Sequence, residues 1–203
     1  MKILNLYAGI GGNRKLWEGH EVTAVENVDY IADAYAKMYP DDTLVRADAH
    51  QYLLDHYKEF DFIWSSPPCP THSRVNLGLQ GWGIHRYPDM GLYQEIIFLK
   101  HFFKGKWIVE NVVAYYEPLI RPNATLNRHW FWSNFDISDY KIASPDVTRS
   151  TKETLAAYQD IQLPEGTKDQ RKLLRNAVHP LIGQHVLNES EDKQLTILAN
   201  GEK

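Results

Sequence analysis

Short apolar runs rich in β-branched residues alternate with helical stretches through the first half of the chain, and this alternation limits the possible folds more than any other feature. Four runs predict strands: KILNLY, EVTAVENV, TLVRAD and DFIWSS, at residues 2–7, 21–28, 43–48 and 61–66. The stretches between them predict helices at residues 14–18, 29–39 and 50–60. Strands that alternate with helices of about ten residues form βαβ units. The sequence therefore predicts an α/β fold, with a mostly parallel sheet and helices on both faces.

The second half of the chain continues this pattern less regularly. Two strands and three helices are predicted, the strands at residues 106–112 and 128–137 and the helices at residues 90–103, 151–161 and 169–187. The last helix is divided at Pro180, and the tail after Leu187 is expected to fray. Residues 67–89 show no regular pattern, so a loop is expected there. Connections of this length are usually functional or disordered.

The size and composition of the chain are those of an ordinary globular protein. With 203 residues, 43% of them hydrophobic, a single domain over residues 1–203 is expected. No apolar stretch is long enough to cross a bilayer, and the N-terminus enters a strand without a secretory or transit signal, so a cytoplasmic location is expected. The single cysteine excludes an internal disulfide. Because neither a Cys cluster nor an HExxH pattern is present, no metal site is predicted.

The distribution of charge leaves a nucleic-acid partner open. The formal net charge is −4, which argues weakly against such a partner because phosphate binding requires Lys and Arg. Acidic residues outnumber basic ones before residue 61, but basic residues outnumber acidic ones between residues 71 and 131. The acidity is therefore concentrated in one region, and the middle of the chain can still meet a polyanion.

A glycine-rich turn and two acidic residues follow the first three predicted strands. The glycines of YAGIGG, at residues 7–12, let backbone N–H groups approach a ligand. Glu26 ends the second strand, where a carboxylate can bind ribose hydroxyls, and Asp48 ends the third, where it can accept a hydrogen bond from an adenine amine. These groups favour a nucleotide-type cofactor. NAD remains an alternative, although the full dinucleotide fingerprint is absent, and a tight turn with two helix-capping acids is the structural alternative.

The only cysteine, Cys69, follows the fourth predicted strand within SSPPCPTHSR (residues 65–74). A thiol held by a Pro-Pro pair at a strand end suits a nucleophile. Glu110 and Asn111 end the strand WIVENV. The charged form of a carboxyl group is unfavourable in a buried strand, so Glu110 is expected to stay protonated or to share a proton, and thus to act as an acid.

These motifs, in this order, resemble those of the cytosine-C5 DNA methyltransferases, of the small kind found in bacteriophages and mobile elements. They are YAGIGG, VTAVENVD, VRADA, SPPCPTHSR, VENV, RHWFWSNF and LLRNAVHP, and they run from about Leu4 to Leu187. The resemblance implies a Rossmann-like class I S-adenosylmethionine-dependent methyltransferase with one catalytic domain. It also implies a role in restriction-modification, in which methylation shields mobile or viral DNA from restriction.

The resemblance further implies a covalent mechanism on DNA. The Cys69 thiolate would attack C6 of a cytosine that has swung out of the helix, and Glu110 would donate a hydrogen bond or a proton to N3. The methyl group would come from S-adenosyl-L-methionine. Arg128 is expected to be catalytic, holding the cytosine and the thiolate. His129 stands where a second arginine is usual, and it is assigned to the substrate.

The cofactor site implied by the resemblance draws on several of these motifs. Tyr7 stands where phenylalanine is usual, which preserves an aromatic surface for stacking. The residues expected to bind S-adenosyl-L-methionine are Tyr7, Ala8, Gly9, Gly11, Gly12, Glu26, Asn27, Asp48, Ala49, Pro68, Leu92, Asn176 and Val178. The last two are late in the sequence but are expected to complete the same pocket.

The interval in which relatives carry a target-recognition domain is short in this chain. It spans about residues 136–175, enough for a helix and a few phosphate contacts but not for a second domain. Recognition of the target is therefore expected to come from the Cys69 loop, from this reduced insert, or from another chain in a homo-oligomer or a partner subunit. The candidate phosphate contacts are Arg74, Arg86 and Lys152, and the candidates for entering the duplex are Gln80 and Trp82.

Two other functions remain open at this point. One branch of the family uses the same active site on RNA, so the alternative function is methylation of cytosine C5 in tRNA. A catalytically silent subunit that binds cofactor or DNA is an alternative of another class. The presence of both Cys69 and Glu110 argues against the silent subunit.

Overall fold

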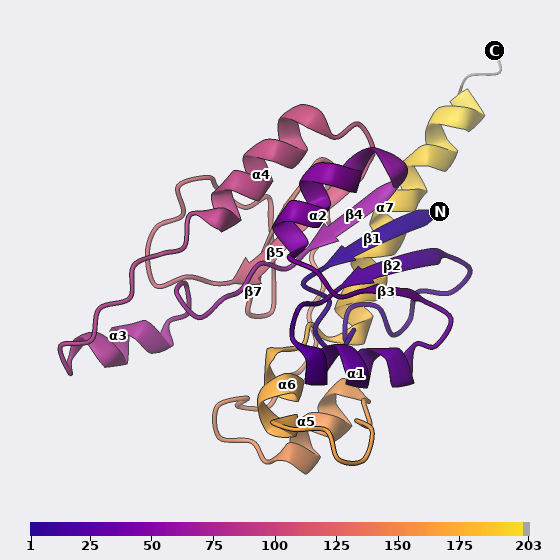
Figure 1. Ribbon diagram of the computed structural model, residues 1–203. Coiled ribbons are helices and arrows are strands. Elements are labelled where there is room, and N and C mark those ends of the chain that lie inside the picture. The colour runs from indigo at the N-terminus through magenta and orange to yellow at the C-terminus, as the bar shows by residue number, and fades with distance from the viewer. Residues whose placement is uncertain (201–203) are drawn as a thin grey trace.

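The fold is that of a computed structural model, which describes residues 1–200 and the side chains of residues 1–191. A seven-stranded sheet has the order β3-β2-β1-β4-β5-β7-β6 (Figure 1). The strands β3, β2, β1, β4 and β5 are parallel, whereas β7 is antiparallel to both β5 and β6. Their bounds are β1 Lys2–Leu6, β2 Glu21–Val25, β3 Thr43–Val45, β4 Phe62–Ser65, β5 Lys106–Val112, β6 Ala124–Leu126 and β7 His129–Ser133.

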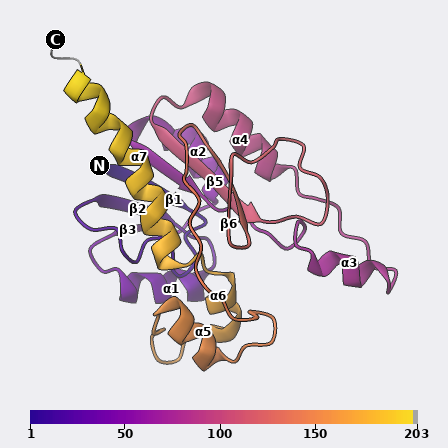
Figure 2. The same cartoon turned by 180° about the vertical axis from the view of Figure 1, so that it is seen from behind.

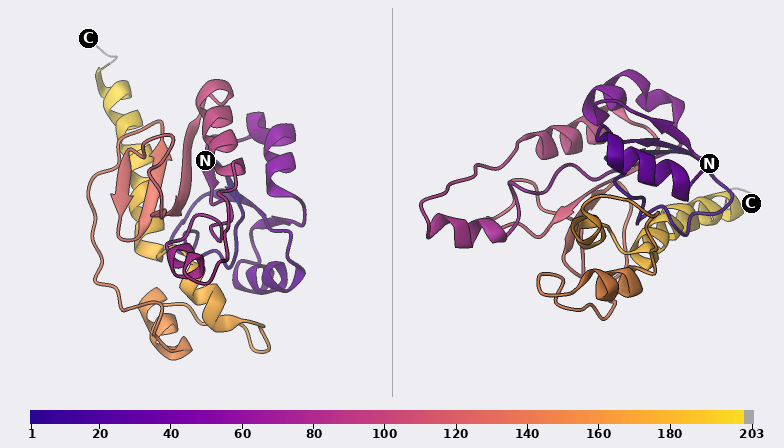
Figure 3. Two further views of the ribbon diagram at one scale, coloured as in Figure 1. Left: turned by 90° about the vertical axis from the view of Figure 1, so that its left-hand side faces the viewer. Right: turned by 60° about the horizontal axis from the view of Figure 1, so that its bottom comes forward.

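Helices cover both faces of this sheet, which confirms the predicted fold class. Figures 2 and 3 show α7 on one face and α2 and α4 on the other. Alternate residues of each strand point to opposite faces, so Leu4 packs with the α2 and α4 side chains while Ile3 packs with α7. The helices are α1 Asp29–Met38, α2 Ala49–His56, α3 Val75–Gln80, α4 Gly91–Phe102, α5 Lys152–Gln159, α6 Gln170–Asn176 and α7 Pro180–Asn200, with a 3-10 turn at Tyr57–Glu59.

The register of the parallel strands decides which residues meet at the carboxyl edge of the sheet. Leu6 lies opposite Ser65, and Ser65 lies opposite Val109. The residues that follow Leu6 and Ser65 therefore emerge side by side from β1 and β4, next to Glu110, which follows Val109 within β5. Within the part of the chain that the structure describes, no helix combines the length and the apolar character needed to cross a membrane.

The helix predicted at residues 14–18 is wrong. These residues form turns, in which the Arg14 amide donates to the Gly11 carbonyl and the Trp17 amide to the Arg14 carbonyl. The Arg14 side chain is held by Asp42, with 2.7 Å between Nη2 and Oδ1. The indole N–H of Trp17 donates to the Gly183 carbonyl of α7. These long-range side-chain contacts accompany the turns that form here in place of the predicted helix.

Three further sequence predictions need correction. Residues 67–89 contain the helix α3, in which the Asn76 side chain donates to the Pro70 carbonyl and links the helix to the Cys69 loop. The strand β6 has no counterpart among the predicted strands, because three residues are too short to show an alternating pattern. The tail after Leu187 does not fray at once, because α7 continues to Asn200; residues 201–203 lie outside the described residues.

Candidate active site

A cavity of about 310 Å³ lies at the carboxyl edge of the sheet. It is lined by the turn after β1, the end of β2, the loop after β4, the end of β5, and segments beside β7 and α6. Most residues singled out in the sequence line it: Tyr7, Ala8, Gly9, Gly12, Glu26, Asn27, Pro68, Cys69, Glu110, Arg128, His129, Asn176 and Val178. A potential cofactor site and a potential nucleophile therefore share one cavity.

The glycine turn after β1 is shaped for close approach to a ligand and is held in place by Glu26. Tyr7 and Gly9 both have left-handed backbone conformations, with φ of 54° and 55°. The Glu26 carboxylate accepts the Gly9 amide at 3.0 Å and the Val28 amide at 2.9 Å. Because this buried side chain joins the turn after β1 to the end of β2, it sets the shape of this end of the cavity.

Several residues expected to bind cofactor or substrate lie outside the cavity lining. Gly11 faces the rings of Tyr35 and Tyr39 behind the turn. Asp48 caps α2 by accepting the Gln51 amide at 2.8 Å, while Ala49 and Leu92 are buried in the core on the α2 and α4 face. Arg74 and Arg86 lie in the projecting segment around α3.

Cys69 follows Pro67 and Pro68 at the end of β4, and its side chain faces the cavity. The Asn111 side chain donates to the Pro67 carbonyl at 2.9 Å and so ties this loop to β5. Burial raises the pKa of the Cys69 thiol, and Glu110 raises it further, whereas Arg128 and Arg175 lower it. On balance the pKa of the thiol lies above its ordinary value, and the two arginines oppose this rise and so favour the thiolate, the reactive form of a cysteine.

Glu110 and His129 form a buried pair between β5 and β7. In the antiparallel register Val112 lies opposite His129 and Glu110 lies opposite Phe131, so Glu110 and His129 are diagonal neighbours on one face. The His129 Nδ1 hydrogen-bonds to Oε1 of Glu110. Burial opposes the charged form of Glu110, but His129, Ser66 and Arg128 together hold its pKa below the ordinary value.

This pairing bears on two expectations from the sequence. Glu110 is expected to stay protonated or to share a proton, and its hydrogen bond with His129 fits the shared proton, because the pKa of Glu110 lies below its ordinary value. His129, expected to bind the substrate, is 3% exposed, contacts Glu110 and lines the cavity, and its contact with the substrate stays a prediction. Arg128, beside it, donates to the Arg175 carbonyl and lines the cavity, and burial lowers the pKa of its guanidinium.

A second buried acid, Glu95 of α4, belongs to none of the motifs recognised in the sequence. It accepts the Tyr7 hydroxyl at 2.5 Å, the Ser65 hydroxyl and, at 3.3 Å, hydrogen-bonds to the His50 ring. These bonds fix the Tyr7 side chain beneath the glycine turn. The only sequence signal is a charged residue within the apolar stripe of α4. Among the residues that the structure describes, no group of three or more His, Cys, Asp or Glu side chains could hold a metal ion.

Comparison with known proteins identifies the family and the fold. A family model described as C-5 cytosine-specific DNA methylase matches residues 1–145. The structure of the Entamoeba histolytica methyltransferase EhMeth has a TM-score of 0.61 at 9% identity, over 96% of this chain and 98% of that chain. A mutant form of Spodoptera frugiperda DNMT2 has a TM-score of 0.65 at 14% identity, over 95% and 100% of the two chains. At such identities these structures show a shared fold. Among curated proteins, none matches the sequence.

The buried pair predicts a strong effect of removing His129. His129→Ala is expected to lower the free energy of unfolding at neutral pH by about 3–5 kcal/mol, because it leaves the Glu110 carboxylate buried without its partner. The double variant His129→Ala/Glu110→Gln is expected to regain part of this loss, since no buried charge remains. Urea unfolding of the three proteins measures both differences.

The same pair predicts the direction of a pH dependence. Because the pKa of Glu110 is lowered in the folded protein, its contribution is fully present above the pKa of an unfolded glutamate, about 4.3, and is lost as the pH falls through the lower folded value. The stability difference between the parent protein and His129→Ala should therefore shrink in this acidic window. A constant difference across it would show that His129 acts through packing alone.

Proposed function

Because the chain belongs to the C-5 cytosine-specific DNA methylase family, we propose that it methylates C5 of cytosine in DNA through a covalent bond between Cys69 and C6 of the base. The supporting observation is that one cavity is lined by Cys69, Glu110, Arg128 and the glycine turn. A nucleophile, a proton donor and a cofactor site are thus within reach of a single pyrimidine ring. The alternative substrate is cytosine in tRNA.

The cofactor of this family is S-adenosyl-L-methionine, and the residues of the cavity fit it. The cavity has the size of a typical small-molecule site. Glu26 places a buried carboxylate after the end of β2, which suits ribose hydroxyls, and the turn from Tyr7 to Gly12 lines the cavity with a backbone that a ligand can approach closely. When bound, the cofactor supplies an electrophilic methyl group. Asn176 and Val178 complete the proposed binding surface from the far end of the sequence.

The side chains of the chain itself account for activation of the base. Arg128 and Arg175 favour the Cys69 thiolate, which adds to C6 of the flipped cytosine and makes C5 nucleophilic. The negative charge that develops at N3 is relieved by a proton that passes through Glu110, which shares one with His129 across their hydrogen bond. Release of the C5 proton to a base then allows the thiolate to leave, which regenerates Cys69.

A projecting arm, defined as residues 71–90, is the proposed contact with nucleic acid. Figures 1 and 3 show this segment, with α3 at its tip, extending away from the body of the protein close to the Cys69 loop. It carries Arg74 and Arg86, and its Trp82 and Tyr87 side chains are 85% and 84% exposed. Cations suit phosphates, and exposed aromatic side chains suit stacking on bases or insertion between them. The arm therefore has the chemistry to replace a separate recognition domain.

Methyl transfer to two nucleic acids tests the proposal. The parent protein is expected to transfer label from S-adenosyl-L-methionine to cytosine C5 of duplex DNA, and Cys69→Ser is expected to lose this activity because an alcohol is a much weaker nucleophile at neutral pH. The variant should still bind the cofactor, as measured by calorimetry, because the glycine turn and Glu26 are unchanged. Transfer to tRNA and not to DNA would assign the RNA substrate, and unchanged transfer by Cys69→Ser would refute the covalent mechanism.

Removal of the arm's charges should weaken nucleic-acid binding selectively. The double variant Arg74→Ala/Arg86→Ala is expected to bind duplex DNA less tightly, and the slope of log affinity against log salt should fall by about 0.9 for each phosphate that the variant no longer neutralises. The matched control is Lys37→Ala/Lys104→Ala, which removes two exposed cations away from the arm. Equal weakening in both double variants would indicate a general charge effect and would exclude the arm as the contact surface.

A further inference from the structure

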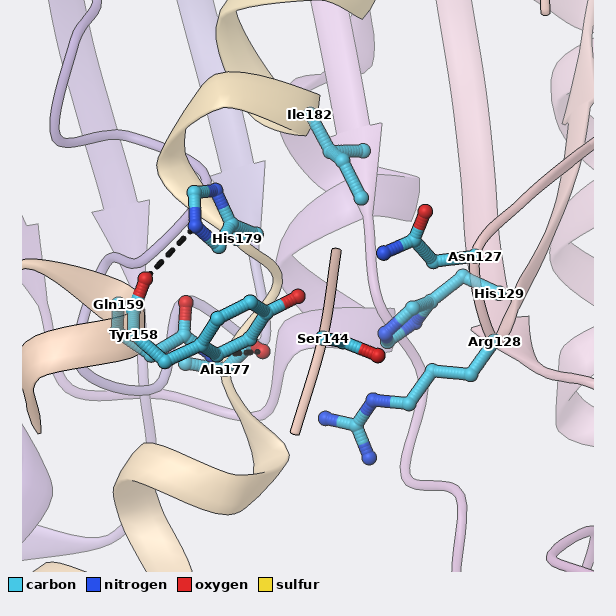
Figure 4. Close-up of a pocket in the computed structure, with 9 residues that line it drawn as sticks. All are labelled: Asn127, Arg128, His129, Ser144, Tyr158, Gln159, Ala177, His179 and Ile182. Atoms are coloured by element: carbon cyan, nitrogen blue, oxygen red, sulfur yellow. Dashed lines mark hydrogen bonds between the residues drawn. The ribbon is translucent and has the colours of Figure 1, made fainter. Parts of the chain in front are cut away.

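Two pockets meet at Arg128 and His129, and the larger of them has room for a cofactor. Figure 4 shows the smaller pocket, which Arg128 lines together with Tyr158 and His179. It encloses about 10 Å³, enough for about one water molecule. The larger pocket is the main cavity, and the glycine turn after β1 forms one of its walls. Side chains that set the shape of this turn therefore affect what the cavity can bind.

Tyr7, the first residue of the turn, has a backbone conformation that a tyrosine rarely adopts. Its φ of 54° lies in the left-handed region, which Gly9 reaches easily but which is unusual for a bulky aromatic residue. Such conformations persist where contacts with the surrounding structure enforce them, and they are common at ligand-binding sites. Tyr7 lines the main cavity and packs against the core on the α2 and α4 face. A contact of Tyr7 with that face can therefore hold the turn in shape.

The Glu95 carboxylate of α4 makes this contact. Its Oε1 atom accepts a hydrogen bond from the Tyr7 hydroxyl at 2.5 Å, and Glu95 is 1% exposed. Burial raises the pKa of Tyr7, and the neighbouring Glu95 raises it further, so the hydroxyl stays protonated and donates. A hydrogen bond in such a buried place is shielded from competition with water. The far end of the Tyr7 ring is thus fixed by a residue 88 positions later in the chain.

Two further bonds hold the Glu95 carboxylate itself. The Ser65 hydroxyl, at the end of β4, donates to Oε2, and the His50 ring of α2 hydrogen-bonds to Oε1 at 3.3 Å. The bond with Glu95 raises the pKa of His50. Two hydroxyls and a ring N–H can all donate, and an ionised carboxylate only accepts, so the three partners suit a carboxylate at this position. With both oxygens engaged, Glu95 has little freedom to follow Tyr7 if the turn moves.

Glu95 and Glu26 act on different parts of the turn. Glu26 accepts the Gly9 amide and restrains the backbone, whereas Glu95 restrains the Tyr7 side chain. We propose that Glu95 is a positioning residue for the cofactor, because by holding Tyr7 it keeps the glycine turn in the conformation that binds. This inference deepens the proposed function and rests on it for the identity of the cofactor. A turn that also populated other conformations would bind more weakly, in inverse proportion to its competent fraction.

Binding of S-adenosyl-L-homocysteine, the product that remains after methyl transfer, tests this role without turnover. In Glu95→Gln the dissociation constant measured by calorimetry is expected to rise roughly two- to tenfold, which corresponds to a competent fraction between about a half and a tenth. The amide has a single oxygen, so it cannot accept from both Tyr7 and Ser65. The matched control is Ile96→Val, which trims the next residue of α4 in the same buried core and leaves the Tyr7 bond in place. Its dissociation constant should not change.

Tyr7→Phe removes the hydroxyl alone and should weaken binding to a similar extent. In the double variant Tyr7→Phe/Glu95→Gln the dissociation constant is expected to rise no further than in the weaker-binding single variant, because both changes break the same bond. Tyr7→Phe also serves if Glu95→Gln does not fold, since it leaves the bonds of Ser65 and His50 to Glu95 intact.

Hydrogen exchange of the backbone amides, measured by mass spectrometry without cofactor, separates positioning from a general loss of stability. Peptides that cover residues 7–12 are expected to exchange faster in Glu95→Gln and in Tyr7→Phe, because the turn opens locally. Peptides that cover α5 should keep the parent rate. In Ile96→Val both regions should exchange as in the parent protein.

Parent-like dissociation constants or parent-like exchange of residues 7–12 in the folded Glu95→Gln and Tyr7→Phe variants would overturn the proposal. Equal effects of Ile96→Val, or additive effects in the double variant, would also overturn it. Failure of the parent protein to bind S-adenosyl-L-homocysteine would refute the proposed cofactor, and the exchange experiment would still decide whether Glu95 holds the turn.

Discussion

The parallel alignment of β1, β4 and β5 is the constraint on which the site depends. In a parallel sheet the carboxyl ends of neighbouring strands lie at one edge, and the register sets Leu6 beside Ser65 and Ser65 beside Val109. The glycine turn and the Cys69 loop leave the sheet after Leu6 and Ser65, and Glu110 follows Val109 within β5. The sheet register thus brings residues far apart in the sequence to one cavity. A shift of one residue in the register of β5 would turn the Glu110 side chain to the opposite face of the sheet.

Three buried or half-buried acids around the cavity are each paired, and this pairing links stability to chemistry. Glu26 bonds two backbone amides, Glu95 bonds the Tyr7 hydroxyl, and Glu110 bonds His129. A buried carboxylate without partners is strongly unfavourable, so each of these bonds stabilises the fold. Each also holds a reactive or ligand-facing group in one orientation, which is the preorganisation that electrostatic catalysis requires.

The sequence predicts best what depends on local patterns. Because β–α alternation puts the strand ends at one edge of the sheet, the sequence is enough to place the glycine turn, Glu26 and the prolyl-cysteine loop there. The roles of Glu110 and His129 cannot be predicted in this way, because their pairing depends on the antiparallel register of β5 and β7, which no local pattern encodes.

Trapping of a covalent intermediate tests the central claim, that Cys69 attacks the base, most directly. The protein is incubated with S-adenosyl-L-methionine and duplex DNA that contains 5-fluorocytosine in the recognised context. The substituted base carries fluorine where a proton must leave, so the thiol cannot depart after methyl transfer. The account predicts a denaturant-resistant protein–DNA complex whose linkage maps to Cys69 and which Cys69→Ala does not form. A complex that persists in Cys69→Ala, or rapid methylation of cytosine by the parent protein with no trapped complex on the fluorinated substrate, would contradict it.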